Sequence, residues 1–438
     1  MESVNTKENK KIRLSTSPYK GTADTYPEEM FYRNYLFNIW TETAKSFGYE
    51  EYDTPLLEEA SLYRAKSGEE LANKQLYAFV DKGGREIAIR PEMTPSLARI
   101  IAAKRKELRL PLRLFNIGRF YRYEKPQRGR SREFFQLNID ILGVGERTSE
   151  VEIIQFIMEV MQKLKAPKET YELRVSSRYL LDYLYNNILK VSGDQKSNIT
   201  KAIDIFPKIS KSYFQKYLED IKLDIEQIKQ LEEFIQWDLG NLEEIKEKSE
   251  GAKELLELFS LLEELDITNV KFCPYIVRGL DYYTGTVIEM FDIGGDKNPR
   301  ALFGGGRYDN LLEIFGEEKL PAFGLGWGDI TTLDYLKTYN LLPSYTPNTE
   351  LFVTLMDKEY IKESFKIASF LREKGINTEV QLEEARLSKQ LDYANKKSIP
   401  WVLIVGQEER KQNKVLLKNM KTSEQLLVSV TDVPARIG

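Results

Sequence analysis

A loop rich in arginine and lysine stands between two stretches that alternate like β-strands. The loop is RFYRYEKPQRGRSR, from Arg119 to Arg132, and EFFQLNIDILG follows it. A guanidinium group presents its N–H donors in a fixed fork that suits the oxygens of phosphate and carboxylate groups. The loop therefore predicts a site for a phosphorylated ligand. The alternative is a solvated basic hairpin tip, which is common on protein surfaces.

The strand after the loop favours the ligand interpretation. Side chains alternate across a strand, so every second residue shares a face. One face carries an aromatic ring, two amides and a carboxylate, contributed by Phe134, Gln136, Asn138 and Asp140. The opposite face is apolar and suits a core. On the incoming strand Arg122 and Glu124 also share a face. Such a polar wall is a poor core and a good floor for a polar ligand.

The composition excludes several kinds of chemistry. The chain has 438 residues, one cysteine (Cys273) and no histidine. An intrachain disulfide, a Cys/His zinc site and a Ser-His-Asp triad within this chain are therefore excluded. Catalysis must therefore rely on carboxylates, guanidinium groups, tyrosines and an ion that a ligand brings. The formal net charge is −4, but a nucleic-acid partner stays possible because phosphate binding depends on local charge.

The elements that must position the loop can be read from the spacing of apolar residues. Apolar residues at helical spacing predict a helix over Glu28–Phe47, which Gly48 ends. In chain order we then expect a strand ending near Pro55, a hairpin with a Gly-Gly turn over 76–94, a helix over 95–108, the two strands beside the basic loop within 112–143, and a helix over 150–164.

The character of the chain changes twice, which predicts its domain organisation. Residues 176–265 are rich in Lys, Glu, Leu and Ile with almost no strand signal, so we expect a helical insertion between residues 1–175 and 266–340. Two prolines near residue 345 predict a linker. Residues 347–438 then alternate strand and helix as a small α/β domain.

No apolar run approaches the roughly 20 residues that a membrane-spanning helix needs. The N-terminal stretch is polar and shows no apolar signal segment. We therefore expect a cytoplasmic protein with no membrane partner.

Five segments resemble one enzyme family. FYRYE with RGRSREFFQL is similar to motif 2 of the class II aminoacyl-tRNA synthetases. RGLDYYTGTVIE (Arg278–Glu289), GGGRYDNLL (Gly304–Leu312), IRPEMTPSLAR (Ile89–Arg99) and KGTADTYPEE (Lys20–Glu29) resemble signature segments of the histidyl-tRNA synthetases in particular. The resemblance covers most of residues 20–330, and the tail resembles the anticodon-binding domain of that family.

The resemblance implies an α+β fold. We expect an antiparallel-sheet catalytic domain with a helical insertion, followed by an α/β anticodon-binding domain. It also implies a histidine–tRNA ligase, which couples L-histidine to histidine tRNA through a histidyl-adenylate. The helix over Glu28–Phe47 with the strand near Pro55 resembles motif 1, the dimer interface of the class, so we expect a homodimer with twofold symmetry.

The family's ATP-binding roles fall on residues of suitable chemistry. Arg122 and Arg278 would be the catalytic pair that holds the α-phosphate, where two guanidinium groups suit the charge of the transition state. Glu124 would accept a hydrogen bond from the adenine amino group, Phe134 would stack on the ring, and Arg130 would reach the outer phosphates. Mg²⁺ would arrive on ATP, with no metal site of the protein's own.

The resemblance also assigns a histidine-binding site. Its residues would be Glu92, Met93, Thr94, Arg122, Gln136, Asp140, Arg278, Tyr282 and Tyr283. Glu92, Thr94 and Gln136 would bind the ammonium end of the amino acid. Asp140 and Tyr283 would bracket the imidazole, because a neutral imidazole offers one donor and one acceptor. On the loop, Lys125, Gln127 and Arg128 would contact the acceptor end of the tRNA.

One residue departs from the family pattern. Motif 3 usually ends with an arginine that packs on adenine and reaches the γ-phosphate, and Thr331 stands at that place. Either Arg300 or Arg307 substitutes, or ATP is held differently. Two other hypotheses stay open: a silent regulatory paralogue, like the synthetase-like subunit of ATP phosphoribosyltransferase, and a tRNA sensor that does not charge tRNA. The departure at Thr331 is the only feature that favours the sensor. That paralogue lacks an anticodon domain and has an eroded RGLDYY segment, whereas both are present here.

Overall fold

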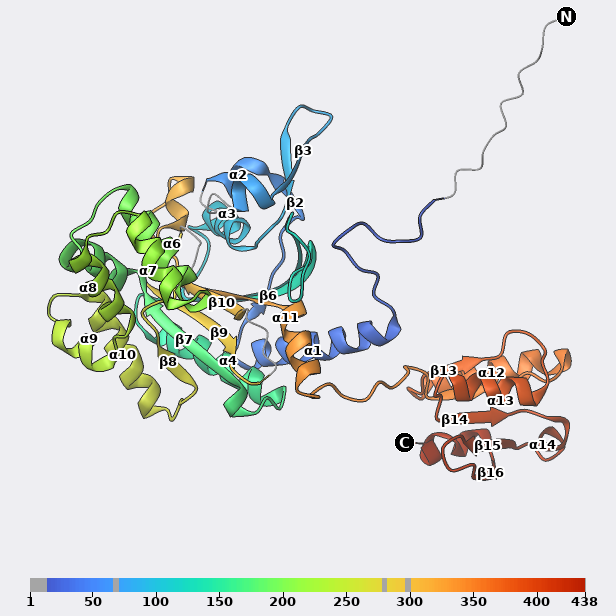
Figure 1. Cartoon of the computed structure of the whole chain (residues 1–438). Coiled ribbons are helices and arrows are strands. Elements are labelled where there is room, and N and C mark those ends of the chain that lie inside the picture. The colour runs from blue at the N-terminus through green and yellow to red at the C-terminus, as the bar shows by residue number, and fades with distance from the viewer. Residues whose placement is uncertain (1–13, 66–70, 278–281, 296–300, 438) are drawn as a thin grey trace, which may run out of the picture. The chain divides into compact units, whose positions relative to one another are not determined.

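The computed structural model describes residues 14–65, 71–277, 282–295 and 301–437. The chain divides into two compact units, one ending at Pro343 and the other beginning at Ser344 (Figure 1). Over the described ranges, no helix combines the length and the apolar character that crossing a bilayer requires.

An eight-stranded sheet forms the centre of the first unit. Its strand order is β1-β5-β6-β11-β10-β9-β7-β8. The six inner strands pair antiparallel, and only the two edge strands run parallel to their neighbours. The antiparallel sheet that the resemblance implied is therefore confirmed. The bounds are β1 (Glu50–Glu51), β5 (Leu112–Tyr121), β6 (Glu133–Leu142), β7 (Tyr171–Ser177), β8 (Val270–Phe272), β9 (Thr286–Asp292), β10 (Ala301–Arg307) and β11 (Ala322–Gly328).

The helices that contribute to the core with the sheet include α1 (Pro27–Ser46), α4 (Thr148–Lys163) and α11 (Asp329–Thr338). The predicted first helix is confirmed, with a proline and two acidic residues in its first turn and Gly48 at φ +78° after its end. Trp40 of α1 is fully buried and lies 6.0 Å from the ring centre of Trp327. Large buried aromatic rings of this kind contribute much of the apolar area that stabilises a core.

A smaller sheet, with strand order β2-β4-β3, carries the predicted hairpin. Its strands are β2 (Leu57–Glu59), β3 (Tyr77–Val80) and β4 (Glu86–Ile89), and the helices beside it are α2 (Ala60–Arg64) and α3 (Thr94–Lys104). Asp81 closes the Gly-Gly turn by accepting from the backbone of Gly83 and Arg85. Glu92 to Thr94 lie at the start of α3, so this hairpin positions them.

The insertion is helical, as predicted, and it belongs to the main core. Its helices are α5 (Arg178–Tyr183), α6 (Asp194–Ile205), α7 (Lys211–Asp220), α8 (Ile225–Ile235), α9 (Leu239–Ile245) and α10 (Glu250–Glu264). Asp224 and Asp238 form capping boxes at the starts of α8 and α9. Gly251 permits close packing of α10 on α5, since a Cβ there would lie 2.5 Å from the backbone nitrogen of Leu180.

The second unit is a five-stranded sheet of order β13-β12-β14-β15-β16 with helices. Strands β12 (Leu351–Val353), β13 (Thr378–Val380) and β14 (Trp401–Ile404) are parallel and alternate with α12 (Ile361–Glu373) and α13 (Leu387–Lys396), as predicted. The antiparallel hairpin of β15 (Val415–Asn419) and β16 (Gln425–Val428) was not predicted. The short helices α14 (Gln407–Lys411) and α15 (Pro434–Ile437) complete the unit.

A buried ion network ties three parts of the first unit together. The guanidinium of Arg307, at the end of β10, is 1% exposed and donates to Glu150 of α4 over 2.6 and 2.9 Å. Arg147 contacts Glu150 at 3.1 Å and Glu254 of insertion helix α10 at 3.3 Å. Removing Arg307 would leave the buried carboxylate of Glu150 with Arg147 as its cationic partner, and so with less compensation for its charge.

We expect Arg307→Met to lower the free energy of unfolding by about 3 kcal/mol, because Glu150 loses its closest cation in a buried setting. Urea denaturation followed by circular dichroism measures this change. Arg85→Ala is the control, since Arg85 pairs with Asp81 on an exposed hairpin, and we expect no measurable change there. An equal change in the free energy of unfolding for the two substitutions would show that the buried network stabilises the fold no more than an exposed ion pair does.

Candidate active site

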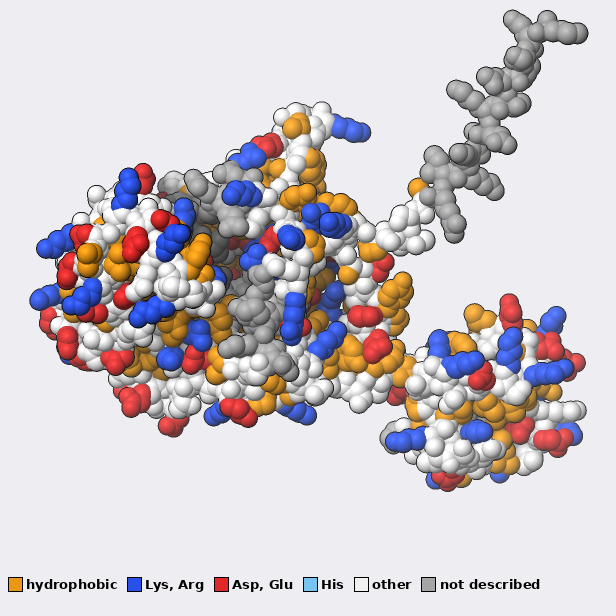
Figure 2. All heavy atoms as spheres, in the orientation of Figure 1, with side chains coloured by type: hydrophobic (Ala, Val, Ile, Leu, Met, Phe, Trp, Pro, Cys, Tyr) orange, Lys and Arg blue, Asp and Glu red, His pale blue; other side chains and the backbone are white. Residues whose placement is uncertain are grey.

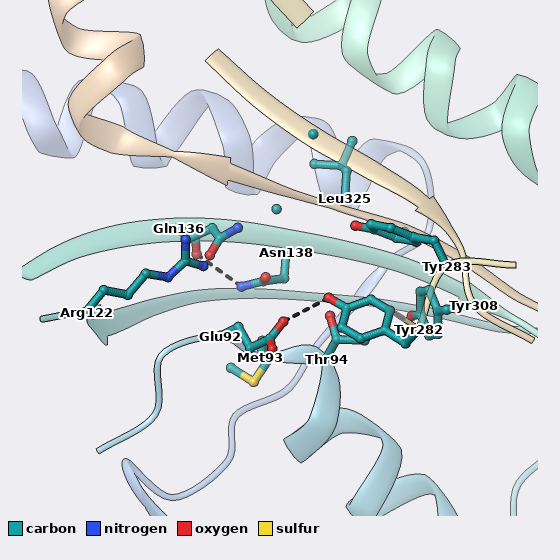
Figure 3. A pocket seen from close by; sticks show the side chains of 13 residues that line it. Glu92, Met93, Thr94, Arg122, Gln136, Asn138, Tyr282, Tyr283, Tyr308 and Leu325 are labelled. Carbon is teal, nitrogen blue, oxygen red and sulfur yellow. Dashed lines mark hydrogen bonds between the residues drawn. The ribbon is translucent and has the colours of Figure 1, made fainter. Parts of the chain in front are cut away.

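A small polar cavity of about 40 Å³ lies over the middle of the large sheet (Figure 3). It brings together seven of the nine residues predicted to bind histidine: Glu92, Met93, Thr94, Arg122, Gln136, Tyr282 and Tyr283. Arg278, predicted for both substrates, lies outside the described residues. The remaining lining residues are Asn138, Gly304, Tyr308, Gly324, Leu325 and Gly326.

One wall of the small cavity is fixed by a buried hydrogen bond. The hydroxyl of Tyr282 donates to Oε2 of Glu92 over 2.8 Å, and both side chains are buried. Burial, reinforced by the charge of Glu92, raises the pKa of Tyr282 well above its usual value. The phenol therefore stays a donor, and it orients the Glu92 carboxylate just before α3.

Asp140 stands behind the cavity wall rather than in it. Its carboxylate accepts a hydrogen bond from the hydroxyl of Tyr308, which does line the cavity. Burial raises the pKa of Asp140 to about 7, an effect that the bond from Tyr308 partly offsets. The structure therefore places Tyr308 beside Tyr283 where we expected Asp140 itself.

Asn138 and Tyr308 were missing from the predicted site, although the sequence carried signals for both. Asn138 lies two residues after Gln136 and so on the same face of β6, and Tyr308 belongs to the glycine-rich segment Gly304–Leu312. The alternation identified the face of the strand. It did not show how deep each side chain lies.

Glycines make room for the side chains of the site. A Cβ at Gly326 would lie 1.6 Å from the side-chain nitrogen of Gln136, and one at Gly324 would lie 2.1 Å from Asp140. A Cβ at Gly306 would lie 2.7 Å from the ring of Tyr283. These glycines belong to strands β10 and β11, so they form a bare floor rather than a turn.

A second cavity of about 630 Å³ adjoins the first and is large enough for a nucleotide. The two cavities share Arg122, Gln136, Gly304 and Gly326. Arg122 is fixed at this junction, because its Nε donates to the carbonyl oxygen of Pro91 over 2.9 Å. Its guanidinium lies 5.1 Å from the ring centre of Phe134.

Four of the five residues predicted to bind ATP line the large cavity, and two of these four form an ion pair with each other. Glu124, Arg130 and Phe134 all lie on its wall. The guanidinium of Arg130 contacts the carboxylate of Glu124 at 2.8 Å. A nucleotide that uses both groups must therefore replace this ion pair with contacts of its own.

Thr331 lies on the wall of the large cavity, and Arg307 does not replace the missing arginine. The hydroxyl of Thr331 donates to the carbonyl oxygen of Leu302 over 2.8 Å. The expectation that Arg307 substitutes is wrong, because its guanidinium is buried against Glu150 and lines neither cavity. Arg300 lies outside the described residues.

The predicted tRNA-contacting residues form the exposed tip of the hairpin between β5 and β6. Backbone bonds between Gln127 and Arg130 close a tight turn, with Gly129 at φ +73°. Arg128 contacts Asp334 of α11 at 3.0 Å. Lys125 and Gln127 are exposed. Figure 2 shows Lys and Arg side chains gathered on this face of the first unit.

The N-terminal segment holds the base of the same hairpin. The backbone nitrogen of Arg132 donates to the carbonyl oxygen of Gly21 over 2.7 Å, and its Nη1 donates to the hydroxyl of Tyr19 over 2.8 Å. Its guanidinium stacks 4.2 Å from the ring centre of Tyr123. The sequence had marked residues 20–29 only as a family segment, without this supporting contact.

Among the residues that the structure describes, no group of three or more His, Cys, Asp or Glu side chains is arranged to hold a metal ion.

Comparison with known proteins places this geometry in a family. The model of the histidyl-tRNA synthetases matches residues 21–328, and that of the anticodon-binding domain matches residues 350–438. The histidine–tRNA ligase of Leptospira biflexa is 40% identical over 431 residues, which cover 98% of each chain. The chloroplastic/mitochondrial histidine–tRNA ligase of Arabidopsis thaliana is 37% identical, over 96% of this chain and 86% of that one.

A solved structure agrees at the level of the fold. The histidyl-tRNA synthetase of Nostoc sp. PCC 7120 superimposes with a TM-score of 0.82 at 24% identity, over 97% of this chain and 99% of that one. The family model covers well over half of the chain. This chain belongs to the histidyl-tRNA synthetase family, a branch of the class II aminoacyl-tRNA synthetases.

Proposed function

We propose that this chain is a cytoplasmic histidine–tRNA ligase that uses ATP to join L-histidine to histidine tRNA. In the first step a carboxylate oxygen of histidine bonds to the α-phosphorus, and the bond to pyrophosphate breaks. In the second step a terminal hydroxyl of the tRNA attacks the carbonyl carbon, and AMP leaves. The observation that carries the proposal is the position of Arg122, at the junction of the small polar cavity and the nucleotide-sized one.

The residues of the small cavity have natural roles in that reaction. Glu92, Thr94 and Gln136 would bind the ammonium group, since a buried carboxylate and polar oxygens suit a cation. Tyr283 and Tyr308 would face the imidazole, with Asp140 orienting the hydroxyl of Tyr308 through their hydrogen bond. A site with buried polar groups rejects side chains that leave those groups unpaired.

The large cavity would hold ATP. Phe134 would stack on adenine, Glu124 would accept from its amino group, and Arg130 would turn from Glu124 to the outer phosphates. Arg122, with Arg278, would hold the α-phosphate as negative charge develops there. Mg²⁺ commonly uses one or two carboxylates together with substrate phosphates. Glu289 and Asp292 line this cavity and fit that role. When bound, the ion would neutralise phosphate charge.

A tRNA sensor without ligase activity is the second candidate, and Thr331 is the residue that favours it. A regulatory paralogue is disfavoured, because residues 350–438 match the anticodon-binding domain that such paralogues lack.

We expect exchange of pyrophosphate into ATP with L-histidine and with none of the other nineteen amino acids offered singly. The physical reason is the pair of phenols and the buried carboxylate that would match an imidazole. Isotope exchange with folded protein measures it. No exchange with any amino acid would favour the sensor.

The double substitution Lys125→Ala with Arg128→Ala should slow tRNA charging about ten-fold or more, since phosphate and base contacts would be lost. Adenylate formation should be unchanged, because both residues lie at the exposed tip. Lys82→Ala with Arg85→Ala, on the other hairpin, is the matched control. Equal losses in both half-reactions would refute this division of roles.

We expect a homodimer, because apolar residues at the motif 1 helix and the following strand are exposed in the single chain: Tyr26 (67%), Met30 (36%) and Leu57 (51%). Sedimentation equilibrium should give twice the chain mass of 51.0 kDa, and Met30→Glu should shift the equilibrium toward the single chain. A single-chain mass for the unaltered protein at micromolar concentration would contradict the dimer.

A further inference from the structure

A row of directly paired residues leads across the sheet from the cavity junction toward the insertion. In register order it is Asn138 of β6, Gly326 of β11, Gly304 of β10, Glu289 of β9 and Arg174 of β7. Directly paired residues point to the same face of a sheet. Strands lie about 4.8 Å apart, so Arg174 stands roughly 10 Å beyond Gly304 along this row. The two glycines have no side chains, so the stretch of sheet between Asn138 and Glu289 is bare.

The guanidinium of Arg174 is held in a fixed plane on the wall of the large cavity. It lies 4.5 Å from the ring centre of Phe291, which also lines that cavity. Its Nε donates to Glu172 over 2.8 Å. A guanidinium has five N–H donors, so the Nη groups carry the other four. A planar cation fixed in this way suits two-point recognition of phosphate oxygens.

In the family the motif 3 arginine reaches the γ-phosphate of ATP, and in this chain Thr331 stands at that place on the wall of the large cavity. Thr331 offers only a hydroxyl, and that hydroxyl donates to Leu302. Of the basic residues lining the cavity, Arg122 sits at the junction and Arg130 lies on the exposed hairpin. Lys208 is 60% exposed and pairs with Asp204. Arg174 is the basic side chain of the cavity wall that lies within a strand of the large sheet, β7.

We propose that Arg174 binds the pyrophosphate end of ATP and so takes over the task of the arginine absent at position 331. The inference rests on the proposed ligase function. As the carboxylate of histidine bonds to the α-phosphorus, the electron pair of the breaking P–O bond passes to pyrophosphate. Arg174 stabilises that growing negative charge from the far side of the bare glycine floor.

The charges around Arg174 favour ATP over the 3′ end of the tRNA as its ligand. Glu172 and Asp204 already accompany Arg174 and Lys208. Glu289 and Asp292 add two more carboxylates to this end of the cavity. A phosphodiester without a bound metal would meet a net negative wall, whereas the pyrophosphate end of ATP brings Mg²⁺ with it.

The test compares ligands that differ in the outer phosphates. Calorimetric titration of Arg174→Gln should show ATP and pyrophosphate binding about ten-fold or more weaker, as expected for loss of a charge-assisted contact. AMP should bind unchanged, since it lacks those phosphates. Arg174→Lys, which keeps the charge, should retain part of the affinity. Arg113→Gln is the matched control, because Arg113 is also a strand arginine paired with a glutamate and lines neither cavity.

Parallel weakening of ATP and AMP, or no change in either, would overturn the role of Arg174. Normal pyrophosphate exchange combined with a slower transfer to tRNA would also overturn it, and would assign Arg174 to the tRNA end. Unaltered protein that exchanges no pyrophosphate would contradict the ligase function instead, while the comparison of ATP with AMP would still decide what Arg174 binds. Thermal melting checks that each variant is folded.

Discussion

The register of β11 between β6 and β10 is the constraint on which the site depends. It places Gly324 and Gly326 beneath the cavity and sends Trp327 into the core, where its ring lies 4.2 Å from that of Phe303. Because side chains alternate strictly along a strand, a slip of one residue would exchange these two sets. After such a slip the side chain of Leu325 would occupy the cavity floor that the glycines leave bare. The buried tryptophan therefore fixes the geometry of the polar cavity on the other face.

The alternation of side chains along β6 correctly predicted which residues form its polar face and which form its apolar face. Leu137 and Ile139 are in the core, and Gln136 and Asn138 line the cavity. Alternation predicts which face of the strand a side chain is on, but not how deeply it is buried. Asp140 was predicted to line the cavity, but it lies behind the wall, where it accepts from Tyr308. The expectation that Arg307 replaces the motif 3 arginine was wrong for a related reason. Its partner Glu150 is 157 residues away in sequence. No local sequence pattern around Arg307 shows that its side chain is buried or that it pairs with so distant a carboxylate.

The basic loop of an acidic chain is balanced by specific carboxylates. Arg130 pairs with Glu124 within the hairpin, and Arg128 pairs with Asp334 of α11. Exposed ion pairs contribute little stability, so a polyanion can displace them at small cost. Composition predicted the charge of the loop but could not name partners that folding brings from elsewhere.

The helical insertion, which composition marked as a separate piece, is physically part of the catalytic domain. Glu254 of α10 reaches the network that fixes Arg307, and Arg307 directly precedes Tyr308 of the small cavity. Asp204 and Lys208 bring the other end of the insertion to the large cavity. Strand β7, from which the insertion departs, carries Arg174. The apolar side chains of the insertion share one continuous core with the sheet rather than forming their own. A change in how the insertion packs would therefore reach both cavities.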